Sequence, residues 1–248
     1  RCACGARSPR PPGMEHRNGE NRMARQRKPK HVSGFVTILG RPNAGKSTLI
    51  ELLTRQYPVA PGAILVNGIP VERIRTSSLR KLIAVVPQDA FLFSRKVSEN
   101  LALGMEIWDI DDVREAAAHV RLDQEIDTWP EGYDAFVGER GVNLSGGQKQ
   151  RMTLARALIR KAGLVILDDA LSAVDARTEE KILKHLRGEL AKTTSIVVSH
   201  RLASVRAVDV ILVLKSDRME AFGRHEELIR VSPTYQSLHE MQMDGSRA

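Results

Sequence analysis

One stretch of the sequence reads Phe35-Val36-Thr37-Ile38-Leu39-Gly40-Arg41-Pro42-Asn43-Ala44-Gly45-Lys46-Ser47-Thr48. Its apolar start predicts a buried strand, and residues 47–57 predict a helix. The loop between them fits the phosphate-binding pattern Gly-x4-Gly-Lys-Ser, in which backbone N–H groups and a helix N-terminus surround a phosphate. We expect Lys46 to neutralise phosphate oxygens and Ser47 to bind Mg²⁺. The pattern predicts a nucleotide site formed by Gly40, Asn43, Ala44, Gly45, Lys46, Ser47 and Thr48.

After this loop the chain alternates between strand-like and helix-like segments. Short β runs are predicted at residues 64–66, 82–86, 164–168, 195–199 and 210–214. Helical patterns are predicted within residues 94–128 and over residues 148–161, 176–191, 202–206 and 225–242. Such alternation predicts an α/β fold with a mostly parallel sheet flanked by helices.

The basic charge of the chain is confined to its start. The 248 residues carry a net charge of +8, and residues 1–31 supply +7 through nine Lys and Arg against two Glu. The basic balance is therefore not a property of a folded face, and we expect no nucleic-acid partner. This Pro- and Arg-rich segment is predicted to be a disordered tail. The chain begins at Arg1, which suggests a fragment, with Met14 and Met23 as candidate starts.

Membrane and zinc signals are weak in this sequence. The longest apolar runs, such as residues 210–214, are far shorter than the ~20 residues that a membrane helix needs. We therefore predict no transmembrane segment in this chain. Cys2 and Cys4 lie alone in the tail without a second ligand pair, so they predict no zinc site.

Two later stretches narrow the interpretation. Leu144-Ser145-Gly146-Gly147-Gln148 is followed by Leu164-Val165-Ile166-Leu167-Asp168-Asp169, an apolar strand that ends in two acids. With the phosphate-binding loop before them, these stretches resemble the ATP-binding cassette (ABC) ATPases. Further similar motifs follow the family's order: Val86-Pro87-Gln88, Ser172-Ala173-Val174-Asp175 and Val197-Val198-Ser199-His200-Arg201. The resemblance covers residues 49–242 and is greatest to the nucleotide-binding domain of an ABC exporter.

The resemblance implies an ATP site shared between two subunits. Ser47, Gln88 and Asp168 would bind Mg²⁺. The residues that would act on the attacking water and the γ-phosphate are Asp169, Gln88 and His200. Residues 144–148, called the signature loop in the family, would bind ATP held by a second nucleotide-binding domain. The loop before residue 176 would bind the same ATP. The residues involved would be Ser145, Gly146, Gly147, Gln148 and Asp175.

The resemblance also implies a domain layout and a membrane partner. Residues 32–242 would form the nucleotide-binding domain, with a helical subdomain at about 94–160 and a flexible end at 243–248. Residues 136–141 resemble the loop that exporters place against their transmembrane domain, and residues 223–228 resemble their C-terminal run. The domain would therefore lie at the cytoplasmic face of the membrane, through a membrane-spanning partner.

Two departures from the family pattern affect the expected activity. Asp169 stands where the family usually has Glu, and a displacement of ~1 Å can lower a rate about 100-fold. The signature loop, residues 144–148, is intact, and residues 168–175 resemble the less active half of the family's heterodimeric exporters. The resemblance therefore implies weak hydrolysis and the less active half of a heterodimer. Residues 1–34 contain no Phe, Tyr or Trp to stack on adenine, so we expect weak binding with little base preference.

Other interpretations stay open. Residues 28–48 resemble the start of an Era-type GTPase, which favours Gly-Arg-Pro-Asn-x-Gly-Lys-Ser. The rest of the chain lacks that family's Asn-Lys-x-Asp and Asp-x-x-Gly motifs. The chain is thus interpreted first as an ATPase domain of an ABC exporter. The alternatives are a nucleotide-binding regulatory module without turnover and an Era-like GTPase fragment.

Overall fold

The computed structural model describes residues 34–40, 45–191, 193–199 and 208–245, with side chains to Met241. All of these lie in the second of two units into which the chain divides, residues 32–248. The predicted tail and the predicted helix at 202–206 lie outside the described residues. The predicted helical subdomain, residues 94–160, contains helices α3 to α6, and the last helix continues to Gly245.

A mostly parallel sheet forms the centre of this unit, as the sequence predicts. Its six described strands have the order β4-β5-β6-β1-β7-β8, and only the last pair is antiparallel. A separate two-stranded sheet pairs β2 with β3. The strands are β1 (Phe35–Gly40), β2 (Leu65–Val66), β3 (Ile69–Pro70), β4 (Ile83–Val86), β5 (Leu164–Asp168), β6 (Thr194–Val198), β7 (Val210–Lys215) and β8 (Arg218–Gly223).

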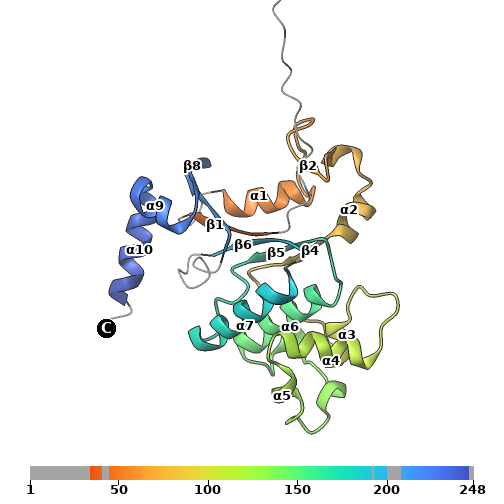
Figure 1. Cartoon of the computed structure of the whole chain (residues 1–248). Coiled ribbons are helices and arrows are strands. Elements are labelled where there is room, and N and C mark those ends of the chain that lie inside the picture. The colour runs from red at the N-terminus through yellow and green to blue at the C-terminus, as the bar shows by residue number, and fades with distance from the viewer. Residues whose placement is uncertain (1–33, 41–44, 192, 200–207, 246–248) are drawn as a thin grey trace, which may run out of the picture. The chain divides into compact units, whose positions relative to one another are not determined.

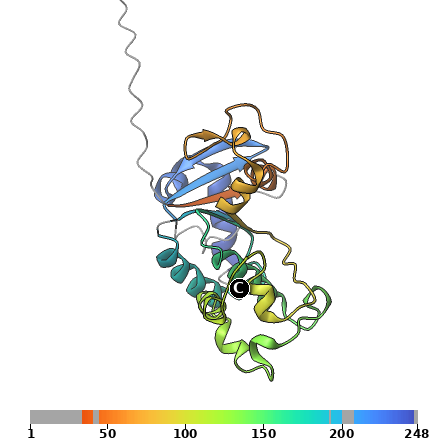
Figure 2. The same ribbon diagram turned by 90° about the vertical axis from the view of Figure 1, so that its right-hand side faces the viewer.

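Helices cover both faces of the sheet (Figures 1 and 2). One face carries α1 (Lys46–Leu53) and α2 (Thr76–Leu82). The opposite face carries α3 (Val97–Leu101), α4 (Ile110–His119), α5 (Asp123–Ile126), α6 (Gly146–Leu158) and α7 (Ala176–Glu189). Beside β7 and β8 lie α9 (His225–Val231) and α10 (Pro233–Gly245), and short 3-10 turns occupy Val71–Arg73, Gly132–Asp134 and Glu139–Gly141.

Strand β5 shows how the sequence produces these layers. Val165 and Leu167 pack into the apolar cluster below the sheet, which includes residues of α6 and α7. Ile166 points to the other face, into the cluster that contains Ile50 of α1 and Leu79 of α2. A strand buried on both faces needs an unbroken apolar run, and its carboxyl end is then held in place by both layers. The backbone of Asp168 and Asp169, at the end of this run, is therefore held in place by the packing of β5.

Two predicted helical segments are shorter than expected. The helix predicted at 47–57 ends at Leu53, because Arg55 takes a φ of 54°, outside the right-handed helical region. The segment 94–128 is divided into three helices. Gly104, with a φ of 89°, lies between α3 and α4, and Asp109 then caps α4 by accepting from the Asp112 N–H at 2.9 Å.

Strand β8 was not predicted from the sequence. It pairs antiparallel with β7, and its large apolar side chains, Met219 and Phe222, are 66% and 62% exposed. Strands are recognised in a sequence when apolar and polar residues alternate, because one face is buried. The large apolar side chains of β8 are exposed, so its sequence does not show this alternation. The backbone pairing with β7 therefore defines it.

Candidate nucleotide-binding site

Strand β1 leads into the candidate phosphate loop, and α1 leaves it. Gly40 ends β1, whereas Asn43 and Ala44 lie in the segment 41–44, outside the described residues. Gly45 has a φ of 84° and is the N-cap of α1, and a Cβ added there would lie 2.7 Å from Oδ1 of Asp217. The left-handed backbone conformation therefore favours glycine, whereas the Asp217 side chain could move aside for a Cβ. The N-terminus of α1, where the first N–H groups have no acceptor within the helix, lies at this loop.

The Lys46 ammonium contacts the end of β1 and interacts with the charges of two acids. Its Nζ donates to the Gly40 carbonyl at 2.7 Å. Burial lowers the pKa of Lys46, and the charges of Asp169 and Asp168 oppose that shift without cancelling it. Burial and the charge of Asp169 raise the pKa of Asp168 more than Lys46 lowers it. The raised pKa of Asp168 means that Lys46 does not fully offset burial and the repulsion from Asp169.

The donor atoms near this charge suit Mg²⁺. Asp168 ends β5, and Gln88 is an exposed residue two positions after β4, the neighbouring strand. Ser47 is an exposed residue in the first turn of α1. Carboxylate, amide and hydroxyl oxygens are the hard ligands that Mg²⁺ prefers. The residues predicted to bind the metal are therefore chemically suited to it.

Asp169 is placed by its own backbone and by β6. It has a φ of 45°, in the left-handed region that aspartate tolerates better than most residues. Its N–H donates to the Val198 carbonyl at 2.9 Å, at the end of β6. His200 lies just after that strand, outside the described residues. Asp168 and Asp169 thus lie at the carboxyl edge of a parallel sheet, where α/β proteins bind their ligands.

The candidate signature loop ends in a capping box at the start of α6. The Ser145 hydroxyl accepts from the Gln148 N–H at 3.2 Å, and Gln148 Oε1 accepts from the Ser145 N–H at 2.9 Å. Added Cβ atoms on Gly146 and Gly147 would lie 3.2 Å and 3.1 Å from the Cβ and carbonyl oxygen of Ala173. The glycines therefore allow the loop to lie directly against Ala173, while Ser145 and Gly146 remain exposed.

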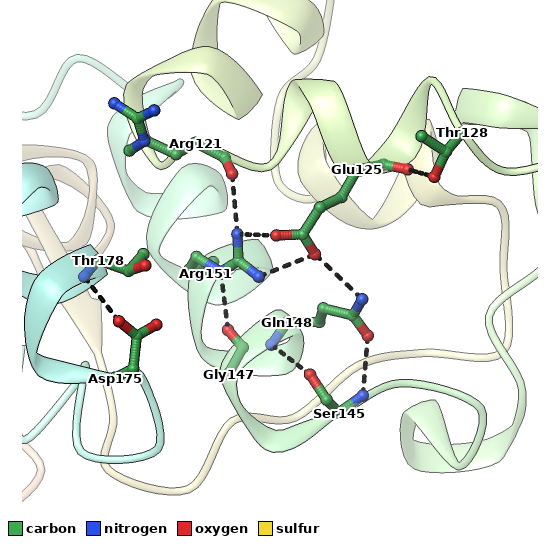
Figure 3. A network of polar contacts seen from close by, with 9 residues as sticks. All are labelled: Arg121, Glu125, Thr128, Ser145, Gly147, Gln148, Arg151, Asp175 and Thr178. Carbon is green, nitrogen blue, oxygen red and sulfur yellow. Dashed lines mark hydrogen bonds and ion pairs between the residues drawn. The ribbon is translucent and has the colours of Figure 1, made fainter.

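An ion pair that sequence reasoning missed supports this loop (Figure 3). Glu125, on α5, accepts from Arg151 Nη1 at 2.6 Å and Nη2 at 2.9 Å, and from Gln148 Nε2 at 3.1 Å. Arg151 also donates to the carbonyls of Arg121 at 2.8 Å and Gly147 at 3.3 Å. Because Arg151 is only 7% exposed, its guanidinium needs these acceptors. The sequence held one sign of this contact: Arg151 follows Gln148 by one helical turn, so both side chains lie on the same face of α6.

We expect the Glu125 pair to make stability depend on pH. Burial raises the pKa of Glu125, but hydrogen bonds from Arg151 and Gln148 and the charge of Arg151 outweigh it, so the pKa lies below its ordinary value. A carboxylate with a lowered folded-state pKa stabilises the fold above its unfolded pKa, and this stabilisation is lost as pH falls through the folded value. Glu125→Gln should therefore lower the melting temperature at neutral pH and flatten its decrease on acidification. Thermal unfolding between about pH 7 and pH 3 measures this.

The control for that experiment is Glu131→Gln, which removes a glutamate that is exposed, whereas Glu125 is half-buried. The control variant should keep the acid dependence of the wild type. Equal slopes for the two variants would contradict the role of Glu125.

A second buried side chain connects α6 with the loop before α7. Gln150 donates from Nε2 to the Ser172 hydroxyl at 2.9 Å and accepts at Oε1 from the Ala173 N–H at 2.7 Å. Asp175 then caps α7 by accepting from the Thr178 N–H at 2.9 Å. This bond and a further one from the Thr178 side chain lower the pKa of Asp175. Asp175 is therefore also a helix cap, a role that the sequence analysis did not assign.

The described site residues form two groups. Gly40, Gly45 and Lys46 lie with Asp168 and Asp169 at the sheet edge. The side chains of Ser145 and Gln148 instead form the capping box of α6, and Gln148 also donates to Glu125.

Comparisons with known proteins agree with this geometry. Residues 32–172 match the family model described as ABC transporter, and this range includes the loop that resembles Era-type GTPases. The chain is 41% identical over 207 residues to YheI of Bacillus subtilis (strain 168), named a probable multidrug resistance ABC transporter ATP-binding/permease protein. It is 42% identical over 206 residues to the multidrug resistance-like ATP-binding protein MdlA of Buchnera aphidicola subsp. Schizaphis graminum.

These matches cover most of this chain but a minor part of each relative. They span 84% of the chain and 35% of YheI, and 83% of the chain and 36% of MdlA. The structure of a bacterial Atm1-family ABC exporter with ATP bound superimposes with a TM-score of 0.82 and 38% identity, over 85% of this chain and 37% of that one. The chain therefore belongs to the ABC transporter family, as a nucleotide-binding domain of the export type.

Proposed function

We propose that this domain binds ATP with Mg²⁺, hydrolyses it slowly, and powers an export-type transporter as the less active half of a heterodimer. The observation that carries the proposal is the meeting of Lys46 with Asp168 and Asp169 at the sheet edge. A cation beside two partly buried acids suits a nucleotide that arrives with its own metal ion.

Each residue of this edge has a separate task. The N–H groups at the start of α1 and the Lys46 ammonium bind the phosphates, and Ser47, Asp168 and Gln88 hold Mg²⁺. The metal neutralises phosphate charge when it is bound. Asp169 orients the attacking water and accepts its proton, with Gln88 and His200 contributing to the same step. Because the Asp169 side chain is one methylene shorter than glutamate, its carboxylate reaches less far from the backbone.

The residues of the signature loop act on the nucleotide of the other subunit. Ser145 is exposed and sits at the N-terminus of α6, a helix of 13 residues. A helix N-terminus and a serine hydroxyl together suit the phosphates of a nucleotide that approaches from outside this chain. We propose that Ser145, Gly146, Gly147, Gln148 and Asp175 close over ATP bound by the partner nucleotide-binding domain.

An exposed apolar surface supports a membrane-embedded partner. Phe91, Phe93, Phe136 and Val142, here called the apolar surface, are 48%, 42%, 59% and 79% exposed. The two segments adjoin, because the Val137 N–H donates to the Arg95 carbonyl at 2.9 Å. Exposed patches of this kind are typical of protein interfaces. Among the described residues no helix is both long and apolar enough to cross a membrane. We propose that the surface binds the cytoplasmic end of a transmembrane domain, which holds the domain at the membrane.

The apolar surface provides a direct test. Phe136→Ser should remove the increase in ATPase rate that the transmembrane partner causes, and should leave the basal rate of the isolated chain unchanged. Phe222→Ser is the matched control, because Phe222 on β8 is 62% exposed, close to the 59% of Phe136. Equal stimulation of both variants in reconstituted vesicles would exclude this surface as the docking site.

The alternative is a regulatory module that binds nucleotide without turnover, and Asp169 favours it. A basal rate no higher than that of Asp169→Asn, with ATP binding retained, would support this alternative. Competition between ATP and GTP for the site tests the GTPase interpretation.

A further inference from the structure

Two helices place a cluster of metal-ligating side chains on the face of the sheet opposite α1. His119 ends α4, and His185 and Glu189 lie one turn apart on α7. His119 Nδ1 and His185 Nε2 are 2.8 Å apart, and His119 Nε2 is 3.9 Å from a carboxylate oxygen of Glu189. One ligand atom from each of the three residues lies within 4.8 Å of the others.

The spacing along the helices makes the cluster more than a chance contact. Glu115 lies one turn before His119 on α4, with an oxygen 3.9 Å from His119 Nε2. Each helix therefore contributes one histidine and one glutamate separated by four residues, which lie on the same helical face. The helices pack against each other, so the two pairs meet across one seam.

The surroundings of the cluster are open and negatively charged. A cavity of about 170 Å³ lies beside His119, and its charged lining includes Glu115, Glu189, Asp112 and Lys161. The His119 side chain is 18% exposed, and His185 and Glu189 are exposed. An ion can therefore reach the cluster without unfolding of the chain.

We propose that His119, His185 and Glu189 bind Zn²⁺, with Glu115 or water in the fourth position. Two imidazoles and one or two carboxylates form a ligand set typical of zinc, and of little use to Mg²⁺. Tetrahedral coordination at ~2.0–2.1 Å needs the two ring nitrogens roughly 3.3 Å apart. His119 and His185 would therefore move apart by about half an ångström, and both rings would turn so that one nitrogen of each faces the ion. The site lies outside the nucleotide chemistry and does not depend on the proposed function.

The bound ion would join parts of the domain that carry different motifs. α4 packs on α6, which begins with the signature loop, and α7 begins directly after Asp175. A ligand that binds only the folded chain stabilises it by mass action. The bound ion would therefore stabilise the packing of α4 against α7.

The test is metal titration of the full 248-residue chain carrying Cys2→Ser and Cys4→Ser, which removes the tail thiols. After treatment with a chelator, the chain should bind one Zn²⁺ and gain about 5 °C or more in melting temperature. Co²⁺ should give the visible absorption of a tetrahedral site. Mg²⁺ should give neither effect.

Variants separate this site from other histidines. His185→Gln and Glu189→Gln should each weaken Zn²⁺ binding by about 10-fold or more. Both residues are exposed, so the metal-free melting temperature should not change. His225→Gln is the control, because His225 lies on α9 beside Tyr235 and His239. Unchanged Zn²⁺ affinity in the two cluster variants, or an equal loss in the control, would overturn the proposal.

Discussion

Lys46→Ala is expected to abolish ATP binding by this domain. The Lys46 ammonium is the cation placed by the structure beside Asp168 and Asp169, and its Nζ is held at the loop by the Gly40 carbonyl. Charge-assisted hydrogen bonds to phosphate contribute about 1.5–3 kcal/mol each, and their loss exposes the phosphates to two carboxylates. We therefore expect the affinity for ATP to fall at least about 100-fold.

Equilibrium binding of a fluorescent ATP analogue measures this effect. Lys81→Ala is the control, because Lys81 lies in the last turn of α2 and its side chain is 78% exposed. A melting temperature close to that of the wild type would show that Lys46→Ala is folded. Retained ATP affinity in a folded variant would remove Lys46 from the phosphate site.

The parts of the fold that the sequence predicted well are those in which local pattern and burial agree. The run before Asp168 is apolar at every position because β5 is buried on both faces, so its ends were predicted to the residue. The edge strand β8 could not be predicted, since Met219 and Phe222 are exposed and its partner β7 defines it. The end of α1 depends on the positive φ of Arg55, which no apolar period signals.

The candidate site divides in the same way. Lys46 and Asp168 could be predicted, because the glycine pattern and a strand end fix their backbone positions. Glu125 could not, since its partner Arg151 is 26 residues away and only packing of α5 against α6 brings them together. The same holds for Gln150, whose contacts with Ser172 and Ala173 cross from α6 to another loop. Side chains that support a site from a distance in the chain leave no spacing to detect.

If this domain is the less active half of a heterodimer, a substitution in the signature loop should lower turnover strongly. A substitution at Asp169 should lower it little. Ser145→Ala should lower turnover of the reconstituted complex about 100-fold, the scale expected when a donor to the transition state is removed. Asp169→Asn should leave turnover within about twofold, because the partner's own acid would activate water at the fast site. ATPase rates of the complex under saturating ATP measure both.

The Ser145 result needs a control for stability, because Ser145 also caps α6 by accepting from the Gln148 N–H. Losing an N-cap costs about 1 kcal/mol, which could reduce activity through unfolding. Ser145→Asp keeps an acceptor for the cap but has no hydroxyl to donate. Both variants should therefore lose turnover, whereas only Ser145→Ala should lower the melting temperature. If Asp169→Asn instead stops turnover, this domain hydrolyses its own ATP, and a symmetric homodimer becomes the better account.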